Sequence, residues 1–106
     1  MHPRPAEVWL ADLGLAAKTR PIVIVSRADP HPPRALAIYV PLTTQERGSD
    51  YEISLGRLPF LKQVSCANVQ GIGSIPYPRL ERRLGVLPSG LFAQLKTALS
   101  FALELN

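Results

Sequence analysis

Two short segments carry polar side chains suited to binding a phosphodiester. In the first, Arg20 and Pro21 lead directly into the apolar run Ile22–Ser26, which places an arginine at the start of a buried strand. In the second, Val40–Gln45, an apolar run ends in two hydroxyls and an amide. A guanidinium neutralises charge on a phosphate, and a hydroxyl such as that of Thr43 can position it. If the two strands are neighbours, these side chains converge at one rim and form a candidate phosphodiester site.

Each of these residues also has a purely structural interpretation. Arg20 can pair with Asp12 or face solvent, and Thr43 can close its turn with a backbone hydrogen bond. Position alone favours these structural roles. However, both segments flank buried strands of one small sheet, and this relation favours a functional role for the two residues as well.

Other candidate chemistry is weak, so we expect neither a metal nor a cofactor. His2 and His31 lie in proline-rich segments without partners at ligand spacing. Cys66 lies in an apolar strand, where burial would raise a thiol pKa and disfavour a nucleophile. Gly71 and Gly73 lack the further glycines and the following helix of a phosphate-binding loop, so a turn or bulge is the simpler interpretation.

Size and charge limit the possibilities further. A chain of 106 residues, 46% hydrophobic and 19% charged, predicts one globular domain over residues 1–106. Its net charge is +4, and most of its 12 basic residues are arginines, which suit phosphate recognition. A solvated basic surface would give the same composition. The start lacks an apolar signal core, no run approaches the roughly 20 apolar residues of a membrane span, and the cysteine is single. We therefore expect a cytoplasmic protein that does not enter a membrane.

The pattern of apolar runs predicts a mainly β fold. Eleven prolines and seven glycines imply many turns and short elements. Arg79–Leu84 fits either a helical turn or a last strand, and the connection Gly56–Gln63 is expected to cover one end of the core. The result would be a five- or six-stranded, strongly bent sheet, a small barrel closed by a C-terminal helix. The five clear strands are Glu7–Ala11, Ile22–Ser26, Leu36–Leu42, Tyr51–Leu55 and Val64–Val69.

The C-terminal segment has the periodicity of an amphipathic helix. Ser89 is placed to cap its first turn through the side-chain hydroxyl. Phe101 falls on the polar side, so it is either lightly exposed or held by a partner subunit. The apolar stripe comprises Leu91, Leu95, Ala98, Leu99, Ala102 and Leu103.

Around Arg20–Ser26 and Val40–Gln45 the chain resembles the MazF/PemK family of toxin endoribonucleases from type II toxin–antitoxin modules. The Arg-Pro-apolar strand and the Pro-x-Thr-Thr-Gln segment, in this order and spacing, carry most of the resemblance. It extends over most of the chain through Glu7–Leu13, Arg20–Ser26, Val40–Gln45, Glu52, Ser74–Ile75 and Arg79–Leu80.

The resemblance implies an SH3-like barrel with a C-terminal helix that acts as a homodimer. The family cuts single-stranded mRNA at short sequences without a metal, as the RNA 2′-hydroxyl attacks the adjacent phosphate. Carried over by position, Arg20 and Thr43 would be catalytic. A basic groove with groups that read splayed bases suits single-stranded RNA. The residues expected to contact RNA are Lys18, Thr44, Gln45, Gln70, Ser74 and Arg79.

One departure from the family concerns the proton acceptor. Many members carry a glutamate in the loop before the arginine, whereas the loop 14–19 of this chain has no carboxylate. An arginine almost never gives up its proton, so Arg20 is a poor base. The base would be Asp12, another residue, or no dedicated group, with catalysis by positioning and charge stabilisation.

The resemblance also implies a partner. Such toxins are neutralised by an antitoxin whose acidic tail occupies the RNA groove. The cluster of Arg79, Arg82 and Arg83 would suit that tail, although a solvated turn explains it equally well.

Two other functions fit a barrel of this kind. A gyrase poison of the CcdB type depends on a Trp-Gly-Ile-like end, whereas this chain ends Leu103-Glu104-Leu105-Asn106. An SH3-like module binds peptides through clustered aromatic residues, and the seven aromatic residues here are scattered.

Overall fold

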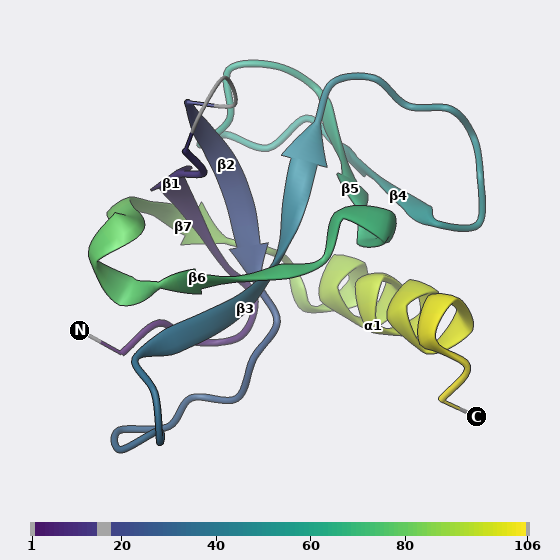
Figure 1. The fold of residues 1–106 in the computed structure, drawn as a ribbon. Helices are drawn as coiled ribbons and strands as arrows, with labels where there is room; N and C mark the ends of the chain where they lie inside the picture. The colour runs from purple at the N-terminus through teal and green to yellow at the C-terminus, as the bar shows by residue number, and fades with distance from the viewer. Residues whose placement is uncertain (1, 15–17, 106) are drawn as a thin grey trace.

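The computed structural model describes residues 2–14 and 18–105 as a curved antiparallel sheet with one C-terminal helix (Figure 1). Two short 3-10 turns, Val69–Gly71 and Tyr77–Arg79, flank the sixth strand. The strands are β1 (Glu7–Asp12), β2 (Thr19–Ile24), β3 (Leu36–Thr43), β4 (Glu52–Gly56), β5 (Ser65–Asn68), β6 (Gly73–Pro76) and β7 (Leu80–Val86), followed by helix α1 (Ser89–Leu103). The described helix is too short to cross a bilayer.

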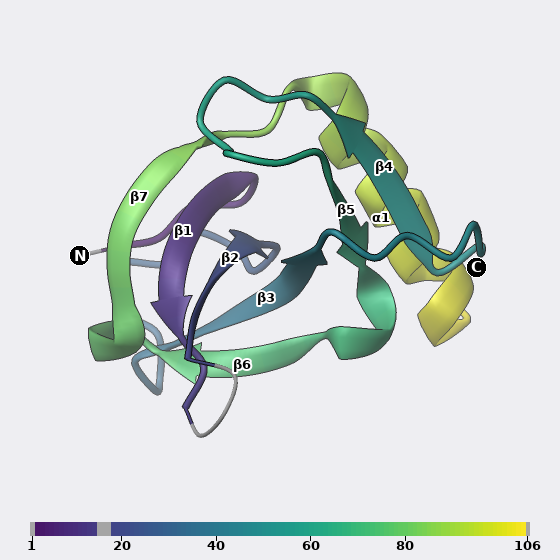
Figure 2. The same cartoon turned by 90° about the horizontal axis from the view of Figure 1, so that it is seen from above.

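The strands follow one another around a ring when viewed from above (Figure 2). Their order is β4-β5-β3-β2-β1-β7, and β6 pairs with β3 beside this path. The order begins at β4 and ends at β7, so the ring is an open barrel. The expected mainly β barrel with a C-terminal helix is confirmed.

Strand β2 is buried on both faces, as its uninterrupted apolar run predicts. Ile22, Val23 and Ile24 are all fully buried. Because successive side chains of a strand point to opposite faces, Val23 joins the larger core beneath the helix. Ile22 and Ile24 join a second core with Ile75 on the other face. The sheet is therefore held in place from both sides at β2.

The strand limits differ from the prediction at the residues that matter most. β2 begins at Thr19, three residues before the predicted start, because Thr19 and Arg20 pair with β1 at Asp12 and Ala11. Arg20 therefore lies within a strand and not ahead of one.

The ambiguous segment is also resolved. Leu80–Val86 is a strand paired with β1, with Leu10 opposite Arg82, and not a helical turn. Tyr51 and Val64, predicted to begin β4 and β5, lie just outside those strands, and Val64 is 51% exposed. Val69 leaves β5 to start a 3-10 turn whose Gln70 N–H donates to Asn68 Oδ1.

Two predictions about the helix are wrong. Pro88 occupies the N-cap, and no side chain, including that of Ser89, caps the first turn. Leu103 is 48% exposed, because the helix reaches its left-handed end at Glu104 beyond the sheet. Leu95 and Ala98 are buried as expected. Phe101, half-exposed, packs edge-on against Tyr51 at 5.3 Å between ring centroids.

The connection between β4 and β5 covers one end of the barrel, as predicted. Leu58 and Leu61 are buried in the larger core, and Phe60 packs against it. The Phe60 ring lies directly over Gly85 of β7: a β-carbon added there would be 2.3 Å from its Cδ2 atom. Only glycine therefore lets the ring approach the strand this closely.

We predict that Gly85→Ala destabilises the protein by about 1–3 kcal/mol, because the added methyl must displace the Phe60 ring. The matched control is Gly90→Ala in α1, where nothing lies within 4 Å of the new atom. It should be neutral or stabilising by up to about 1 kcal/mol. Urea unfolding measures both, and equal stabilities of the two variants would contradict the packing described.

Candidate active site

A cleft opens where the pairing of β3 with β2 ends. β3 pairs with β2 only through Tyr39–Pro41, and its other edge pairs with β5 through Leu42 and Thr43. Pro21 has no backbone N–H to continue the ladder between β2 and β3 beyond Pro41. The first residues of β2 therefore separate from the end of β3.

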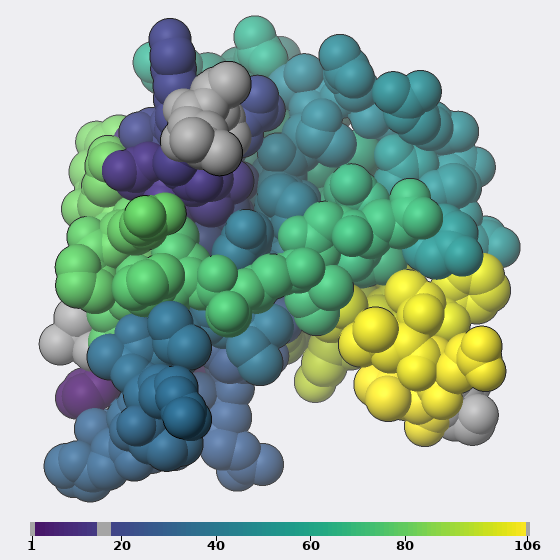
Figure 3. All heavy atoms as spheres, in the orientation of Figure 1, coloured from purple at the N-terminus to yellow at the C-terminus, as the bar shows by residue number. Residues whose placement is uncertain are grey.

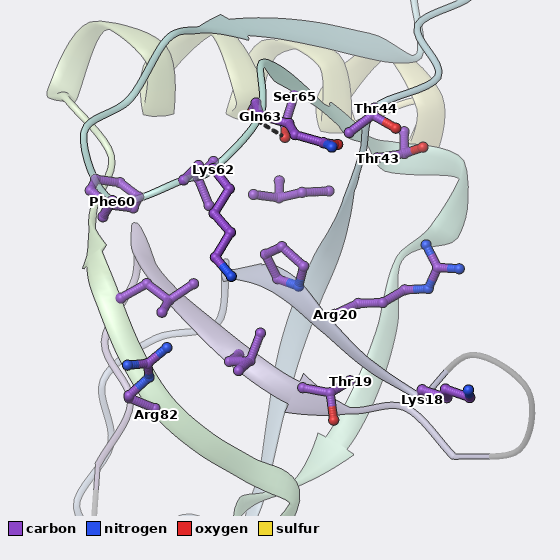
Figure 4. A pocket seen from close by; sticks show the side chains of 15 residues that line it. Lys18, Thr19, Arg20, Thr43, Thr44, Phe60, Lys62, Gln63, Ser65 and Arg82 are labelled. Carbon is purple, nitrogen blue, oxygen red and sulfur yellow. Dashed lines mark hydrogen bonds between the residues drawn. The ribbon is translucent and has the colours of Figure 1, made fainter.

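The cleft has a volume of about 680 Å³ and is formed by β1, β2, β3, β7 and the connection before β5 (Figure 4). Apolar side chains, among them Leu10, Pro21 and Leu42, line it together with hydroxyls and cations. Its lining residues are Leu10, Lys18, Thr19, Arg20, Pro21, Leu42, Thr43, Thr44, Phe60, Leu61, Lys62, Gln63, Ser65, Arg82 and Leu84.

The charge of this lining is of one sign. Lys18, Arg20, Lys62 and Arg82 are all solvent-exposed cations. No aspartate or glutamate occurs among the described lining residues. Such a lining attracts an anion. Several cations in one cleft can contact successive phosphates of one strand, and each contact adds to the affinity. Phe60 is the one aromatic among them, so the described cleft is not an aromatic peptide groove of the SH3 kind.

Arg20 and Thr43 meet at this cleft, as their positions on two neighbouring strands predict. Figure 4 places Arg20, Thr43 and Thr44 toward one side, with Lys62 and Arg82 toward the other. The Thr43 side chain is half-buried, and its Oγ1 accepts the Gln45 N–H at 3.1 Å. The turn-closing role considered for Thr43 is thus present. It leaves the hydroxyl proton available for an oxygen in the cleft.

Lys18 also lines the cleft, in an unusual conformation. Its φ of 55° is left-handed, which costs a residue with a side chain about 1–2 kcal/mol. Its carbonyl accepts the Leu13 N–H at 3.0 Å, so the bond across the base of the loop helps to hold this geometry. The central residues of that loop, including the segment whose missing carboxylate departs from the family, lie outside the described residues.

The other residues expected to contact RNA lie outside the cleft lining. Gln45 follows the Thr43 turn, and Gln70 is exposed on the 3-10 turn after β5. Ser74 is exposed on β6, opposite Ile38. Arg79 ends the turn before β7, near Gly14. Their contact with RNA stays a prediction.

The predicted arginine cluster divides in the structure. Arg82 lines the cleft, whereas Arg83 pairs with Glu7 at 3.5 Å. Neighbouring residues of a strand point to opposite faces, so one sequence cluster serves two surfaces. Arg82 is the cross-strand partner of Leu10, so its side chain lies on the same face of the sheet as that of Leu10, which lines the cleft.

Sequence reasoning missed the side chains that come from the β4–β5 connection. Lys62 and Gln63 lie between Leu61 and Ser65, which are both buried. This polar pair just before a buried strand was the sequence signal that could have identified them as cleft residues. The Ser65 hydroxyl donates to the Gln63 carbonyl at 3.1 Å, which fixes the chain there (Figure 4).

Two carboxylates lie near the cleft without lining it. Asp12 Oδ1 accepts the Gly14 N–H at 2.9 Å. Glu81 Oε2 lies 3.5 Å from the Thr19 hydroxyl that donates to it. In the part of the chain that the structure describes, no three His, Cys, Asp or Glu residues are placed to hold a metal.

Glu52 organises the loop that follows Thr43 and Thr44. Its carboxylate accepts the backbone N–H groups of Arg47 and Ser49 and the Ser49 hydroxyl at 2.9–3.2 Å. The Ser49 and Arg47 hydrogen bonds lower the pKa of Glu52. Burial, followed by the charges of Glu52 and Glu46, raises the pKa of Cys66, which lies beside Thr43 across the sheet.

The family model of the PemK-like, MazF-like toxins of type II toxin–antitoxin systems matches residues 4–103. The chain belongs to this family. No curated protein sequence matches it.

Solved structures of similar proteins support the same assignment. A mycobacterial endoribonuclease in complex with its cognate antitoxin is 27% identical, with a TM-score of 0.85 and coverage of 98% of this chain and 97% of its own. The Mycobacterium tuberculosis toxin MazF-mt6 is also 27% identical, with a TM-score of 0.83 and coverage of 94% and 98%. The MazE–MazF structure from Deinococcus radiodurans, 18% identical with a TM-score of 0.80 and full coverage of both chains, shows the shared fold alone.

We predict that Glu52 and its loop titrate together. Because the folded pKa is lowered, the carboxylate stabilises the loop above the unfolded pKa, and this contribution is lost as the pH falls through the folded pKa. In NMR titrations the Arg47 and Ser49 amide shifts should follow the Glu52 carboxyl, with a midpoint below that of a glutamate in an unstructured peptide.

Glu52→Gln should abolish this acid transition of the two amides, whereas Asp50→Asn, an exposed carboxylate in the same loop, should keep it. Amides that do not follow Glu52 in the unmodified protein would contradict the hydrogen-bonded loop.

Proposed function

We propose that this protein is a single-domain toxin that cleaves single-stranded RNA, with Arg20 and Thr43 at the scissile phosphate. The observation that carries the proposal is their meeting in one cleft that has four cations and no carboxylate in its described lining. The match to the toxin family and the likeness to endoribonuclease structures support the same activity.

In the proposed reaction the ribose 2′-oxygen attacks the neighbouring phosphorus, and the bond from phosphorus to the 5′-oxygen breaks. The products are a 2′,3′-cyclic phosphate and a 5′-hydroxyl, and the proton of the 2′-hydroxyl ends on the leaving oxygen. Negative charge builds on the phosphorane oxygens, where the Arg20 guanidinium stabilises it. The Thr43 hydroxyl donates to the same phosphate and aligns it for in-line attack.

No carboxylate among the described lining residues of the cleft is available to take the proton of the 2′-hydroxyl. Arg20 keeps its proton, and Asp12 is engaged by Gly14 outside the cleft lining. The rate enhancement proposed here comes from positioning the 2′-hydroxyl and from stabilising charge.

We further propose the associations that belong with this activity. The protein acts in the cytoplasm as a homodimer and is neutralised by an antitoxin with an acidic tail. A positively charged cleft that binds RNA also binds acidic peptide, so the two ligands compete for it. One mycobacterial relative is known in complex with its cognate antitoxin, which supports this pairing.

The test is to incubate the purified protein with a long RNA in the presence of EDTA and to map the new ends. We expect cuts at defined sequences that leave cyclic phosphates. Arg20→Ala and Thr43→Val should each lower the cleavage rate about 100- to 1,000-fold, the usual effect of losing one group that stabilises the transition state. Thr43→Ser keeps the hydroxyl and should retain more activity than Thr43→Val.

The matched control is Arg34→Ala, which removes an exposed arginine from the loop between β2 and β3 and should cleave at the normal rate. That loop lies at the bottom of Figure 1, whereas the start of β2 lies at the top. No cleavage of varied RNAs by the unmodified protein would overturn the proposal.

A further inference from the structure

A second cationic site lies on the far wall of the cleft. Lys62 and Arg82 line this wall, and Figure 4 shows both on the side away from Arg20 and Thr43. They come from the β4–β5 connection and from β7, two elements that contribute neither Arg20 nor Thr43. The cleft therefore has cations at both ends.

The backbone beneath both cations is fixed. Lys62 follows Leu61, which is buried and whose N–H donates to the Leu58 carbonyl at 3.1 Å. Arg82 stands in β7 opposite Leu10. A cation on a fixed backbone loses less conformational freedom when it binds than one on a mobile loop.

The cleft lining also has apolar side chains. Leu10, Pro21 and Leu42 are among them, and Figure 4 shows Phe60 on the same side of the cleft as Lys62 and Arg82. RNA also combines charged and less polar groups, because a sugar and a base separate one phosphate from the next. An aromatic ring beside a cationic groove is the usual means of holding an unpaired base.

We propose that Lys62 and Arg82 bind the phosphate next to the scissile one, while the intervening nucleoside lies over the apolar lining of the cleft. This inference rests on the proposed function, because Arg20 and Thr43 define the scissile position. The minimal good substrate then carries a phosphate beyond the cleaved bond. Shortening the RNA or neutralising that phosphate weakens binding.

The first experiment measures binding without chemistry. A fluorescent single-stranded RNA with 2′-fluoro groups lacks the attacking hydroxyl, and anisotropy gives its affinity at several salt concentrations. Lys62→Ala/Arg82→Ala should weaken binding roughly tenfold, and lower the slope of log affinity against log salt by about 0.7, the value for one lost phosphate contact to a single strand.

The control double variant is Lys96→Ala/Arg34→Ala, which removes the same two residue types from exposed positions outside the cleft. Lys96 belongs to α1, the yellow element at the lower right of Figure 3, and stands over the Phe92 ring at 5.2 Å. If this control weakens binding as much as the cleft variant, the effect is general charge and the subsite is overturned.

The second experiment compares two short RNAs that contain the mapped cleavage sequence. They differ only in whether the phosphate next to the cleaved bond is natural or a neutral methylphosphonate, tested on each side in turn. On one side the neutral group should raise KM roughly tenfold for the unmodified protein and little for Lys62→Ala/Arg82→Ala. Equal penalties in both proteins on both sides would overturn the subsite.

The two proposals fail differently. If the unmodified protein cleaves and both double variants behave alike, the subsite is wrong and the proposed function stands. If the unmodified protein cleaves no RNA, the proposed function is wrong, and the binding comparison alone then decides whether these cations hold a phosphate.

Discussion

The pairing of strand β3 with β2 ends at Pro41, and the candidate site depends on this ending. β2 pairs with one edge of β3 only as far as Pro41, while the other edge of β3 pairs with β5 at Leu42 and Thr43. Pro21, which has no backbone N–H to donate to β3, lies at the point of separation. The strands stay within one buried sheet, because Ile22, Val23 and Ile24 hold β2 in both cores. Rigid backbone therefore borders an opening in the sheet, a suitable support for groups that must be positioned before they bind.

The electrostatics of the opening follow from which elements border it. Cations reach it from β2, β7 and the connection before β5, while the nearby carboxylates form hydrogen bonds with neighbouring backbone N–H groups. Glu52 holds the loop after Thr44, and Asp12 holds the turn after β1. The acids thus shape the backbone around a cleft that they leave positively charged, and this separation of roles suits an anionic polymer.

Local patterns predicted much of this arrangement. The apolar run after Pro21 identified the central strand, and Arg20 and Thr43 were predicted to meet because both flank buried strands. Lys62 was missed, and Arg82 was predicted only as part of an arginine cluster suited to an antitoxin tail. Their approach to one another depends on the curvature of the whole sheet, which brings β7 and the β4–β5 connection to the same cleft. The start of β2 was also misplaced, since its first residues are held by pairing with β1 and carry no apolar signal of their own.

We propose that Arg20 and Thr43 share one phosphate at the place where β2 and β3 separate. A crystal structure of the protein with a single-stranded RNA that carries 2′-fluoro groups tests it most directly. We expect a phosphate within hydrogen-bonding distance of both the Arg20 guanidinium and the Thr43 hydroxyl, with the RNA chain continuing through the cleft. RNA bound on another face, with water between these two side chains, would contradict it.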